Sequence, residues 1–256
     1  MSDHIVVSED SGIVTIQINR PDKRNALTAK MYAAIAEALQ QAEADSRIRV
    51  VFLTGTDDCF TSGNDVVDFM QNPPPDENSP VFRFLHAISN FKKPIIAAVN
   101  GPAVGVGTTL LLHCDLIYAA QSSVFQAPFV SLGLCPEAAS SYLLPLLVGL
   151  PKAAEILMLG ESFNAETALR YGLINAIFPD SDYRQLAYDK AKKLAAQPAK
   201  GVRLTKQLLR KTNAALVMKT MAEEAEHFKA MLQSAEANEA ISAFLQKRKP
   251  DFAQFD

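Results

Sequence analysis

Asn100-Gly101-Pro102-Ala103-Val104-Gly105-Val106-Gly107 follows a short apolar run and leads into an apolar helical pattern. A strand that enters a helix through such a turn leaves free backbone N–H groups and the positive end of the helix dipole there. A second turn, Phe60-Thr61-Ser62-Gly63-Asn64-Asp65, follows another apolar run. Two loops whose N–H groups converge on one point can stabilise a developing negative oxygen, as an oxyanion hole does. We therefore take the two turns as the candidate centre of a functional site.

Both turns also have a structural interpretation that involves no chemistry. The first can be an ordinary strand-to-helix turn in which Asp65 caps the next helix. The second can reflect close packing of a helix on a strand, which glycine permits. This second turn also lacks the third glycine of a dinucleotide fingerprint and the Gly-Lys-Ser/Thr of a phosphate loop. A nucleotide-phosphate cradle is therefore not predicted.

One acidic residue, Glu137, lies in Leu134-Cys135-Pro136-Glu137-Ala138, at the start of an expected helix over residues 138–148. A carboxylate beside an oxyanion hole can move a proton next to a carbonyl group. The alternative is a first-turn residue that only complements the helix dipole. Burial would raise the pKa of Glu137 and the helix end would lower it, so the sequence leaves the direction open.

Composition restricts the class of protein. The 256 residues are 48% hydrophobic and 21% charged, which is typical of a globular protein with a large core. A net charge of −3 without an arginine-rich run gives no case for nucleic acid, and the apolar stretches are too short to span a bilayer. No signal peptide is visible, so we expect a cytoplasmic protein without membrane partners. Three widely spaced cysteines indicate reduced thiols, with neither a disulfide frame nor a metal site: Cys59, Cys114 and Cys135.

The alternation of strand and helix patterns predicts an α/β fold. A hairpin turns at residues 10–12, and Thr28 caps a helix. Helices are expected at 66–70, 82–91 and 107–113, strands at 50–55, 94–99 and 115–119, and a loop at 73–79. Beyond Glu137, one strand (173–178) accompanies helices at 138–148, 152–159, 165–171, 182–196, 202–232 and 236–247. We divide the chain into an α/β core (1–195) and a helical C-terminal region (196–256).

Further segments, taken with the two turns, resemble the enoyl-CoA hydratase/isomerase (crotonase) superfamily over nearly the whole chain. They are residues 19–27 (NRPDKRNAL), 114–119 (CDLIYA), 125–128 (FQAP), 165–174 (AETALRYGLI) and 243–250 (AFLQKRKP). The resemblance implies a spiral core of repeated ββα units and a helical C-terminal region that mediates trimers or dimers of trimers. It also implies an acyl-CoA substrate, the CoA thioester itself being the only coenzyme involved.

The resemblance assigns roles to particular residues. The backbone N–H groups of Ser62 and Val106 would form the oxyanion hole. CoA would lie along Arg24 and Ala26, with further substrate contacts at Gly63, Asn64, Asp65, Gly105, Phe129 and Leu132. Phe244 and Lys247 match positions that reach the nucleotide end of CoA bound to a neighbouring subunit.

The departures from the family pattern point to a subtype. Hydratases of the family use two glutamates, and the matching positions hold Thr109 and Phe129. Residues 136–142 (PEAASSY) instead resemble the delta-3,delta-2-enoyl-CoA isomerases of β-oxidation. The resemblance thus implies that Glu137 takes a proton from C2 of a 3-enoyl-CoA and returns one at C4. Two alternatives stay open: another acyl-CoA reaction, such as hydrolysis or atypical hydration, and acyl-CoA binding without catalysis.

Five apolar side chains are candidates for the lining of an acyl pocket, although each could equally belong to the core. They are Phe69, Met70, Phe82, Leu85 and Phe129.

Overall fold

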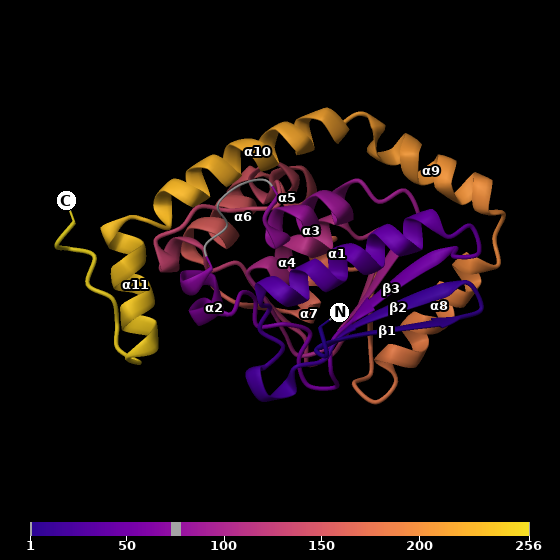
Figure 1. Ribbon diagram of the computed structural model, residues 1–256, viewed down its shortest axis with the longest axis horizontal. Helices are drawn as coiled ribbons and strands as arrows, with labels where there is room; N and C mark the ends of the chain where they lie inside the picture. The colour runs from indigo at the N-terminus through magenta and orange to yellow at the C-terminus, as the bar shows by residue number, and fades with distance from the viewer. Residues whose placement is uncertain (1, 73–77, 256) are drawn as a thin grey trace.

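The computed structural model describes residues 2–72 and 78–255. A mixed six-stranded sheet forms the centre of the protein (Figure 1). The strand order is β1-β2-β3-β4-β6-β9, and every pair except the antiparallel β1–β2 is parallel. The strands are β1 (Ile5–Asp10), β2 (Ile13–Ile18), β3 (Val50–Thr54), β4 (Ile95–Val99), β6 (Leu116–Ala120) and β9 (Ala176–Phe178). The α/β prediction is confirmed.

The hairpin between β1 and β2 turns at Ser11 and Gly12, as the sequence predicts. Their φ angles are 51° and 79°, and Asp10 pairs with Ile13 across the turn. Two successive residues with positive φ match the twist of a two-residue hairpin.

Helices cover both faces of the sheet because the buried strands alternate their side chains between two cores. Val51 and Leu53 of β3 pack with α1 (Ala29–Ala44) and α3 (Pro80–Ser89). Val50 and Phe52 point the other way, to α8 (Tyr183–Ala195). The Thr28 hydroxyl accepts a hydrogen bond from the Met31 N–H, so the predicted cap of α1 is confirmed.

A second sheet of three short strands was not predicted. It consists of β5 (Pro102–Val104), β7 (Val124–Gln126) and β8 (Phe163–Asn164), in the order β5-β7-β8. Strands of two or three residues are too short for side-chain alternation to identify them. The other helical elements are η1 (Pro21–Lys23), α2 (Val66–Gln71), α4 (Val106–Thr109), η2 (Leu110–His113), η3 (Val130–Leu132), α5 (Ser140–Val148), α6 (Leu150–Ala154), η4 (Glu155–Leu159) and α7 (Ala165–Arg170).

The C-terminal helices arch over the rest of the chain (Figure 1). They are α9 (Ala199–Lys211), α10 (Ala214–Met231) and α11 (Ala235–Leu245), and α11 packs against η3. The prediction of one continuous helix over 202–232 is wrong, because the helix is interrupted at Thr212–Asn213. The apolar pattern continues through the break, so periodicity alone did not reveal it. The boundary near residue 195 stays a prediction.

Three further predictions from the sequence concern the cysteines, membrane-spanning helices and the loop at 73–79. The cysteines are free: Cys59 and Cys114 are buried and Cys135 is half-buried. Within the described residues, no helix is both long and apolar enough to cross a bilayer. Most of the loop expected at 73–79 lies outside the described residues.

Gly101 offers a test of the close approach between the two glycine turns. A Cβ there would lie 2.1 Å from the Asp58 carbonyl oxygen, and the φ of Gly101 is 62°. We expect Gly101→Ala to lower the free energy of unfolding by about 3 kcal/mol, through left-handed strain and overpacking.

Denaturant titration measures this change. Gly201→Ala is the matched control, because nothing lies within 4 Å of its added Cβ and Gly201 belongs to α9. It should raise the unfolding free energy by up to about 1 kcal/mol through helix propensity. Equal effects of the two substitutions would contradict the account.

Candidate active site

Backbone hydrogen bonds join the two glycine turns directly. The Thr61 N–H donates to the Pro102 carbonyl and the Val104 N–H donates to the Thr61 carbonyl, each at 3.0 Å. Thr61 and Ala103 thereby form a parallel bridge. Glycine is required at this contact, because a Cβ on Gly107 would lie 2.6 Å from Thr61 Cγ2. The first and second turns are therefore fixed relative to each other.

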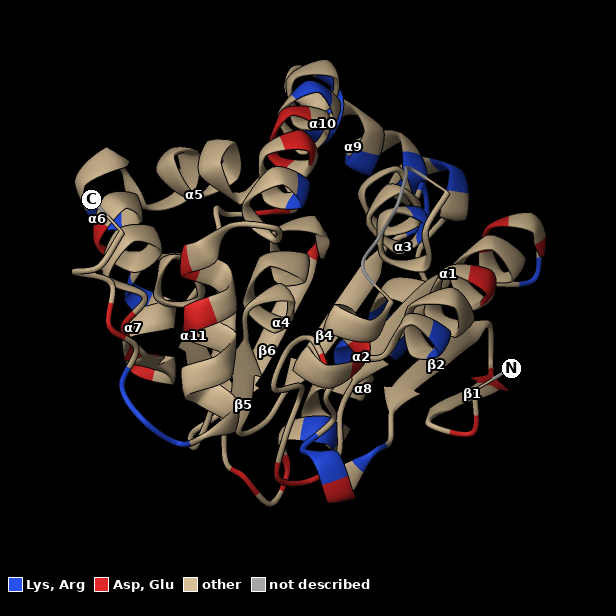
Figure 2. Cartoon of the chain, turned by 60° about the vertical axis from the view of Figure 1, so that its left-hand side comes forward, with Lys and Arg blue, Asp and Glu red and all other residues tan. Residues whose placement is uncertain are grey.

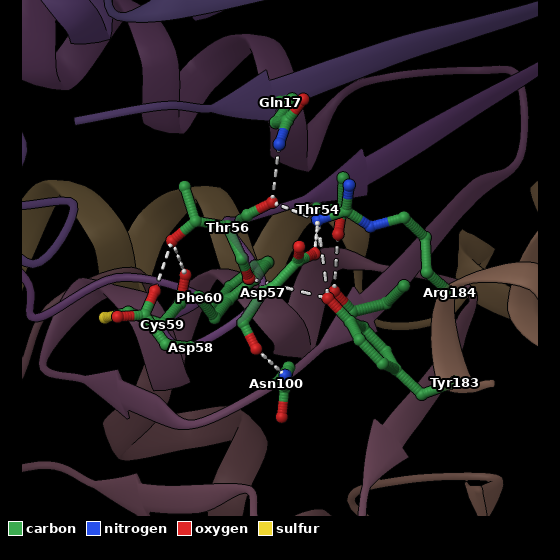
Figure 3. Close-up of polar contacts among 12 residues, drawn as sticks. Gln17, Thr54, Thr56, Asp57, Asp58, Cys59, Phe60, Asn100, Tyr183 and Arg184 are labelled. Atoms are coloured by element: carbon green, nitrogen blue, oxygen red, sulfur yellow. Dashed lines mark hydrogen bonds and ion pairs between the residues drawn. The ribbon is translucent and has the colours of Figure 1, made fainter. Parts of the chain in front are cut away.

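Polar side chains from three elements brace the loop between β3 and the first turn (Figure 3). Gln17 of β2 and Arg184 of α8 both donate to the Gly55 carbonyl, at 3.1 and 2.9 Å. Arg184 also pairs with the Asp57 carboxylate at 3.1 Å, and Asn100 of the second turn donates to the Asp57 carbonyl. These contacts fix the approach to the first turn.

Asn25, which is fully buried, braces the first turn from the other side. Its side-chain amide donates to the Cys59 carbonyl at 2.7 Å, and its backbone carbonyl accepts a hydrogen bond from the Thr61 hydroxyl at 2.7 Å. Asn25 has a φ of 57°, which asparagine tolerates better than most residues. The conformation of the first turn is therefore specified by side chains that are distant in sequence.

The amides of Asn64 and Val106 are free backbone donors, one at each turn. Within residues 2–72 and 78–255, neither N–H has a hydrogen-bond acceptor. The expectation that Ser62 supplies a donor does not fit this geometry, because the Ser62 N–H already donates to the Arg24 carbonyl at 3.0 Å. Gly63, whose φ is 91°, reverses the chain and frees the amide that follows it. The glycine before Asn64 was the sequence signal for a free amide at this position.

Glu137 is buried beside α4. Its side chain accepts a hydrogen bond of 2.5 Å from the Thr109 hydroxyl, and only 8% of the residue is exposed. Burial raises the pKa of Glu137 to about 7; the Thr109 hydrogen bond opposes that rise, and the charge of Glu224 adds to it. Neither α4 nor α5 carries a charged residue (Figure 2), so no cation there lowers the pKa. The direction that the sequence left open is therefore upward.

The helix after Glu137 begins later than the sequence predicted. Ala138 and Ala139 have φ angles of 60° and 56°, and α5 starts at Ser140. Glu137 is therefore not a first-turn residue of that helix, and the dipole interpretation does not apply to it. An Ala-Ala pair gives no sequence signal of a left-handed turn, since alanine favours the right-handed helix.

A cleft of about 970 Å³ runs past the two turns. Its lining includes ten of the residues named from the sequence: Ala26, Ser62, Gly63, Asn64, Asp65, Gly105, Val106, Phe129, Leu132 and Phe244. Arg24 and Lys247 are not part of it. Phe244 lines the cleft of its own chain, where α11 packs against η3, and its contact with CoA of a neighbouring subunit stays a prediction.

Three cationic residues that sequence reasoning did not single out line the same cleft: Arg20, Lys23 and Arg248. Arg20 forms an ion pair of 2.7 Å with Asp65, which also caps α2. Arg248 pairs with Glu239 at 2.5 Å. Their only sequence signal was membership of the segments that resemble the family.

A narrow apolar cavity of about 20 Å³ has Glu137 in its lining, whereas the larger cleft does not. Phe69, Phe82 and Leu85 line it, whereas Phe129 lines the larger cleft and Met70 is exposed. Asn64 borders both spaces. Its side-chain oxygen accepts a hydrogen bond from the buried Tyr32 hydroxyl. Burial, and then the charge of Glu137, raise the pKa of Tyr32, so the tyrosine stays neutral.

No group of three or more His, Cys, Asp or Glu side chains that could hold a metal ion occurs within the described residues. The donors that meet at the turns are backbone amides, and the only carboxylate that lines the narrow cavity besides Glu137 is Glu224. The arrangement therefore combines a protonatable carboxylate, unpaired backbone donors and an apolar cavity.

Comparisons with known proteins agree with the fold. The family model for enoyl-CoA hydratase/isomerase matches residues 8–255. The chain is similar to enoyl-CoA delta isomerase 2 of Rattus norvegicus, with 37% identity over 96% of this chain and 64% of that protein. The chain therefore spans less than two thirds of that relative's length.

Two further matches extend over whole chains. The 1,2-epoxyphenylacetyl-CoA isomerase of Escherichia coli (strain K12) is 34% identical, covering 98% of this chain and 99% of that protein. A solved enoyl-CoA hydratase/isomerase structure from Pseudoalteromonas atlantica T6c has a TM-score of 0.93 and 42% identity, covering 98% and 100% of the two chains. This chain belongs to the enoyl-CoA hydratase/isomerase (crotonase) family.

The burial of Glu137 predicts a pH-dependent cost in stability. In the unfolded chain its pKa is near the ordinary 4.5, and in the folded protein it is about 7. Below about pH 4.5 the group is protonated in both states and costs nothing. Above about pH 7 the folded protein must bury the charge, at about 3 kcal/mol.

We therefore expect Glu137→Gln to be more stable than the wild type by up to about 3 kcal/mol at about pH 8, and no different at about pH 4. Denaturant unfolding at the two pH values measures this difference. Glu226→Gln is the control, because the Glu226 side chain is 79% exposed. A Glu137→Gln effect that does not change with pH would contradict the raised pKa.

Proposed function

We propose that the protein is an enoyl-CoA isomerase that shifts the double bond of a 3-enoyl-CoA to give the trans-2-enoyl-CoA. The observation that carries the proposal is a buried carboxylate, Glu137, with a pKa of about 7, beside an apolar cavity bordered by the turn that holds a free amide. A general base works best when its pKa is near the working pH. The match to enoyl-CoA delta isomerase 2 supports the same choice.

In the proposed reaction, the Glu137 carboxylate takes one proton from C2 of the 3-enoyl thioester. The electron pair of that C–H bond becomes the C1–C2 double bond of a dienolate, and the negative charge moves to the thioester oxygen. The amides of Asn64 and Val106 donate hydrogen bonds to this oxygen, which strengthens their contact as the charge develops. Glu137 then gives the same proton to C4, so the double bond ends between C2 and C3 and the carboxylate is restored.

The residues around Glu137 argue against ordinary hydration. The two positions that hold glutamates in hydratases are occupied by Thr109 and Phe129, both buried. Thr109 directs its hydroxyl to Glu137, and Phe129 is an apolar part of the cleft wall. One base suffices for a proton shift, whereas adding water across a double bond requires a base and an acid that act together.

The cleft suits an acyl-CoA. Its lining includes the cations of Arg20, Lys23 and Arg248, which would contact the phosphates of CoA, although Arg20 and Arg248 also pair with Asp65 and Glu239. The thioester would then reach the amides of Asn64 and Val106, and the acyl chain would continue into the apolar cavity beside Glu137. Contacts of CoA with Arg24 and Lys247, which are not part of the cleft lining, remain proposals from the family pattern.

Self-association as a trimer, or as a dimer of trimers, is part of the proposal. Large apolar side chains are exposed on the C-terminal helices and on the segment after α5, and contiguous apolar surface favours association. Among them are Leu204, Leu208, Leu209, Leu150, Met158 and Leu159, each more than half exposed.

The direct test is the turnover of a 3-enoyl-CoA, followed by the absorbance of the conjugated product, with a trans-2-enoyl-CoA run in parallel. We expect isomerisation by the wild type and a kcat about 10²–10⁴-fold lower in Glu137→Gln, which keeps the shape and removes the base. Glu226→Gln should behave as the wild type. Hydration of the 2-enoyl substrate, release of free CoA, or binding without turnover would each reject the isomerase in favour of the corresponding alternative.

The pKa of Glu137 predicts the pH profile. Because the ionised carboxylate is the active form, kcat/KM should rise with pH and level off above a midpoint near 7. Thr109→Val removes the hydrogen bond that favours the carboxylate, so the rising limb should move to higher pH. A profile in which the substitution leaves the midpoint unchanged would show that Glu137 is not the group that titrates.

A further inference from the structure

The turn directly after Glu137 adopts an unfavourable backbone conformation. Ala138 and Ala139 both lie in the left-handed region, with φ angles of 60° and 56°. Each non-glycine residue there costs about 1 kcal/mol or more, so two in succession require contacts that hold them. The turn determines the direction in which the side chain of the adjoining Glu137 points away from the backbone. Whatever holds this pair therefore also orients the candidate base.

The carboxylate of Glu224, on α10, holds one end of the turn. It accepts hydrogen bonds from the Ala139 N–H at 2.6 Å, from the Ser141 N–H at 2.9 Å and from the Ser141 hydroxyl at 2.5 Å. Helix α5 begins after Ala139, which has no side chain that could cap it. Glu224 therefore supplies the missing cap from another helix, 83 residues further along the chain. A carboxylate at a helix N-terminus is also favoured by the helix dipole.

The side chain of His113, at the end of η2, holds the other end. Its Nε2 lies 2.8 Å from the Ala138 carbonyl oxygen, and only 1% of the residue is exposed. Burial lowers the pKa of His113 to about 4, so the ring is neutral and the contact requires the tautomer with hydrogen on Nε2. The Ala138 carbonyl and the Ala139 amide are thus both tied to side chains outside the loop.

Resting on the proposed function, we propose that Glu224 is a positioning residue for Glu137. It acts through the left-handed Ala138–Ala139 turn, whose other end His113 fixes, and keeps the Glu137 carboxylate directed at the reacting carbons. The C-terminal helix α10 is in this way part of the catalytic geometry. Displacing a catalytic group by about 1 Å can cost about 10²-fold in rate.

Electrostatics distinguishes this role from simple helix capping. The titratable groups that act on Glu137 or feel its charge are Tyr32 of α1, Cys135 of its own segment and Glu224 of α10, while the Thr109 hydroxyl of α4 is a neutral donor. Burial raises the pKa of both Tyr32 and Cys135, so these two stay neutral. Burial also raises the pKa of Glu224, against the hydrogen bonds from Ser141 and Ala139 that favour its ionised form, and the negative charge of that ionised form raises the pKa of Glu137. Removing that charge should move the rising limb of the pH profile to lower pH.

The test compares Glu224→Gln and Glu224→Ala with the wild type and with Glu226→Gln, a control on the same helix whose side chain is 79% exposed. Three quantities are measured: kcat and KM for a 3-enoyl-CoA, the midpoint of the pH profile, and amide hydrogen exchange at Ala139 and Ser141. Glu224→Gln keeps the shape of the side chain and one acceptor oxygen, so it decides the matter if Glu224→Ala does not fold.

We expect Glu224→Gln to lower kcat at least about tenfold, and Glu224→Ala about 100-fold, with little change in KM. The rising limb should move to lower pH in both. Exchange at Ala139 and Ser141 should be about five to ten times faster than in the wild type, as expected for a lost cap. The control should change none of the three quantities.

Several results would overturn the proposal. They are an unmoved pH limb in Glu224→Gln, a rise in KM without a fall in kcat, or slow exchange at Ala139 and Ser141 that persists in the variants. If the wild type itself does not isomerise the substrate, the proposed function fails. In that case the exchange rates alone decide whether Glu224 holds the turn, so the two failures are distinguishable.

Discussion

The pair of backbone hydrogen bonds between Thr61 and the Pro102–Val104 strand is the constraint on which the rest of the structure depends. It joins two turns that arrive from neighbouring parallel strands, β3 and β4, and it fixes the spacing between the unpaired amides of Asn64 and Val106. Glycine at position 107 is needed to bring the backbones this close. Because these hydrogen bonds fix the two turns relative to each other, the two amides are held in place before any ligand arrives, and electrostatic stabilisation in enzymes relies on such preorganisation.

Glu137 illustrates how a functional position opposes stability. An ionised carboxyl in an apolar setting is costly, and a protein designed only to fold would place a neutral residue there. The Thr109 hydroxyl compensates in part, since it donates to the carboxylate without bringing a positive charge that would return the pKa to its usual range. The nearby charge of Glu224 acts in the opposite sense. The balance leaves a group that can both accept and release a proton near neutral pH.

How much of the structure could be predicted from the sequence depended on the length of the hydrophobic pattern in each segment. Buried strands such as β3 and β4, the hairpin at Ser11–Gly12 and the Thr28 cap followed from hydrophobic runs and turn chemistry. The glycine turns and Glu137 were found, but Ser62 was chosen in place of Asn64, because only the hydrogen bond to Arg24 reveals which amide is already paired. The left-handed Ala138–Ala139 pair and its partner Glu224 could not be predicted from the sequence, since tertiary contacts there override local propensity.

Transfer of the C2 hydrogen tests the central claim, a one-base proton shift by Glu137, most directly. A 3-enoyl-CoA deuterated at C2 would be converted in ordinary water, and the product at low conversion analysed by mass spectrometry for deuterium at C4. Because Glu137 is buried, the account predicts that a measurable share of the deuterium moves from C2 to C4 before it exchanges with solvent. A C4 hydrogen that comes entirely from water would contradict transfer by a single shielded carboxyl group.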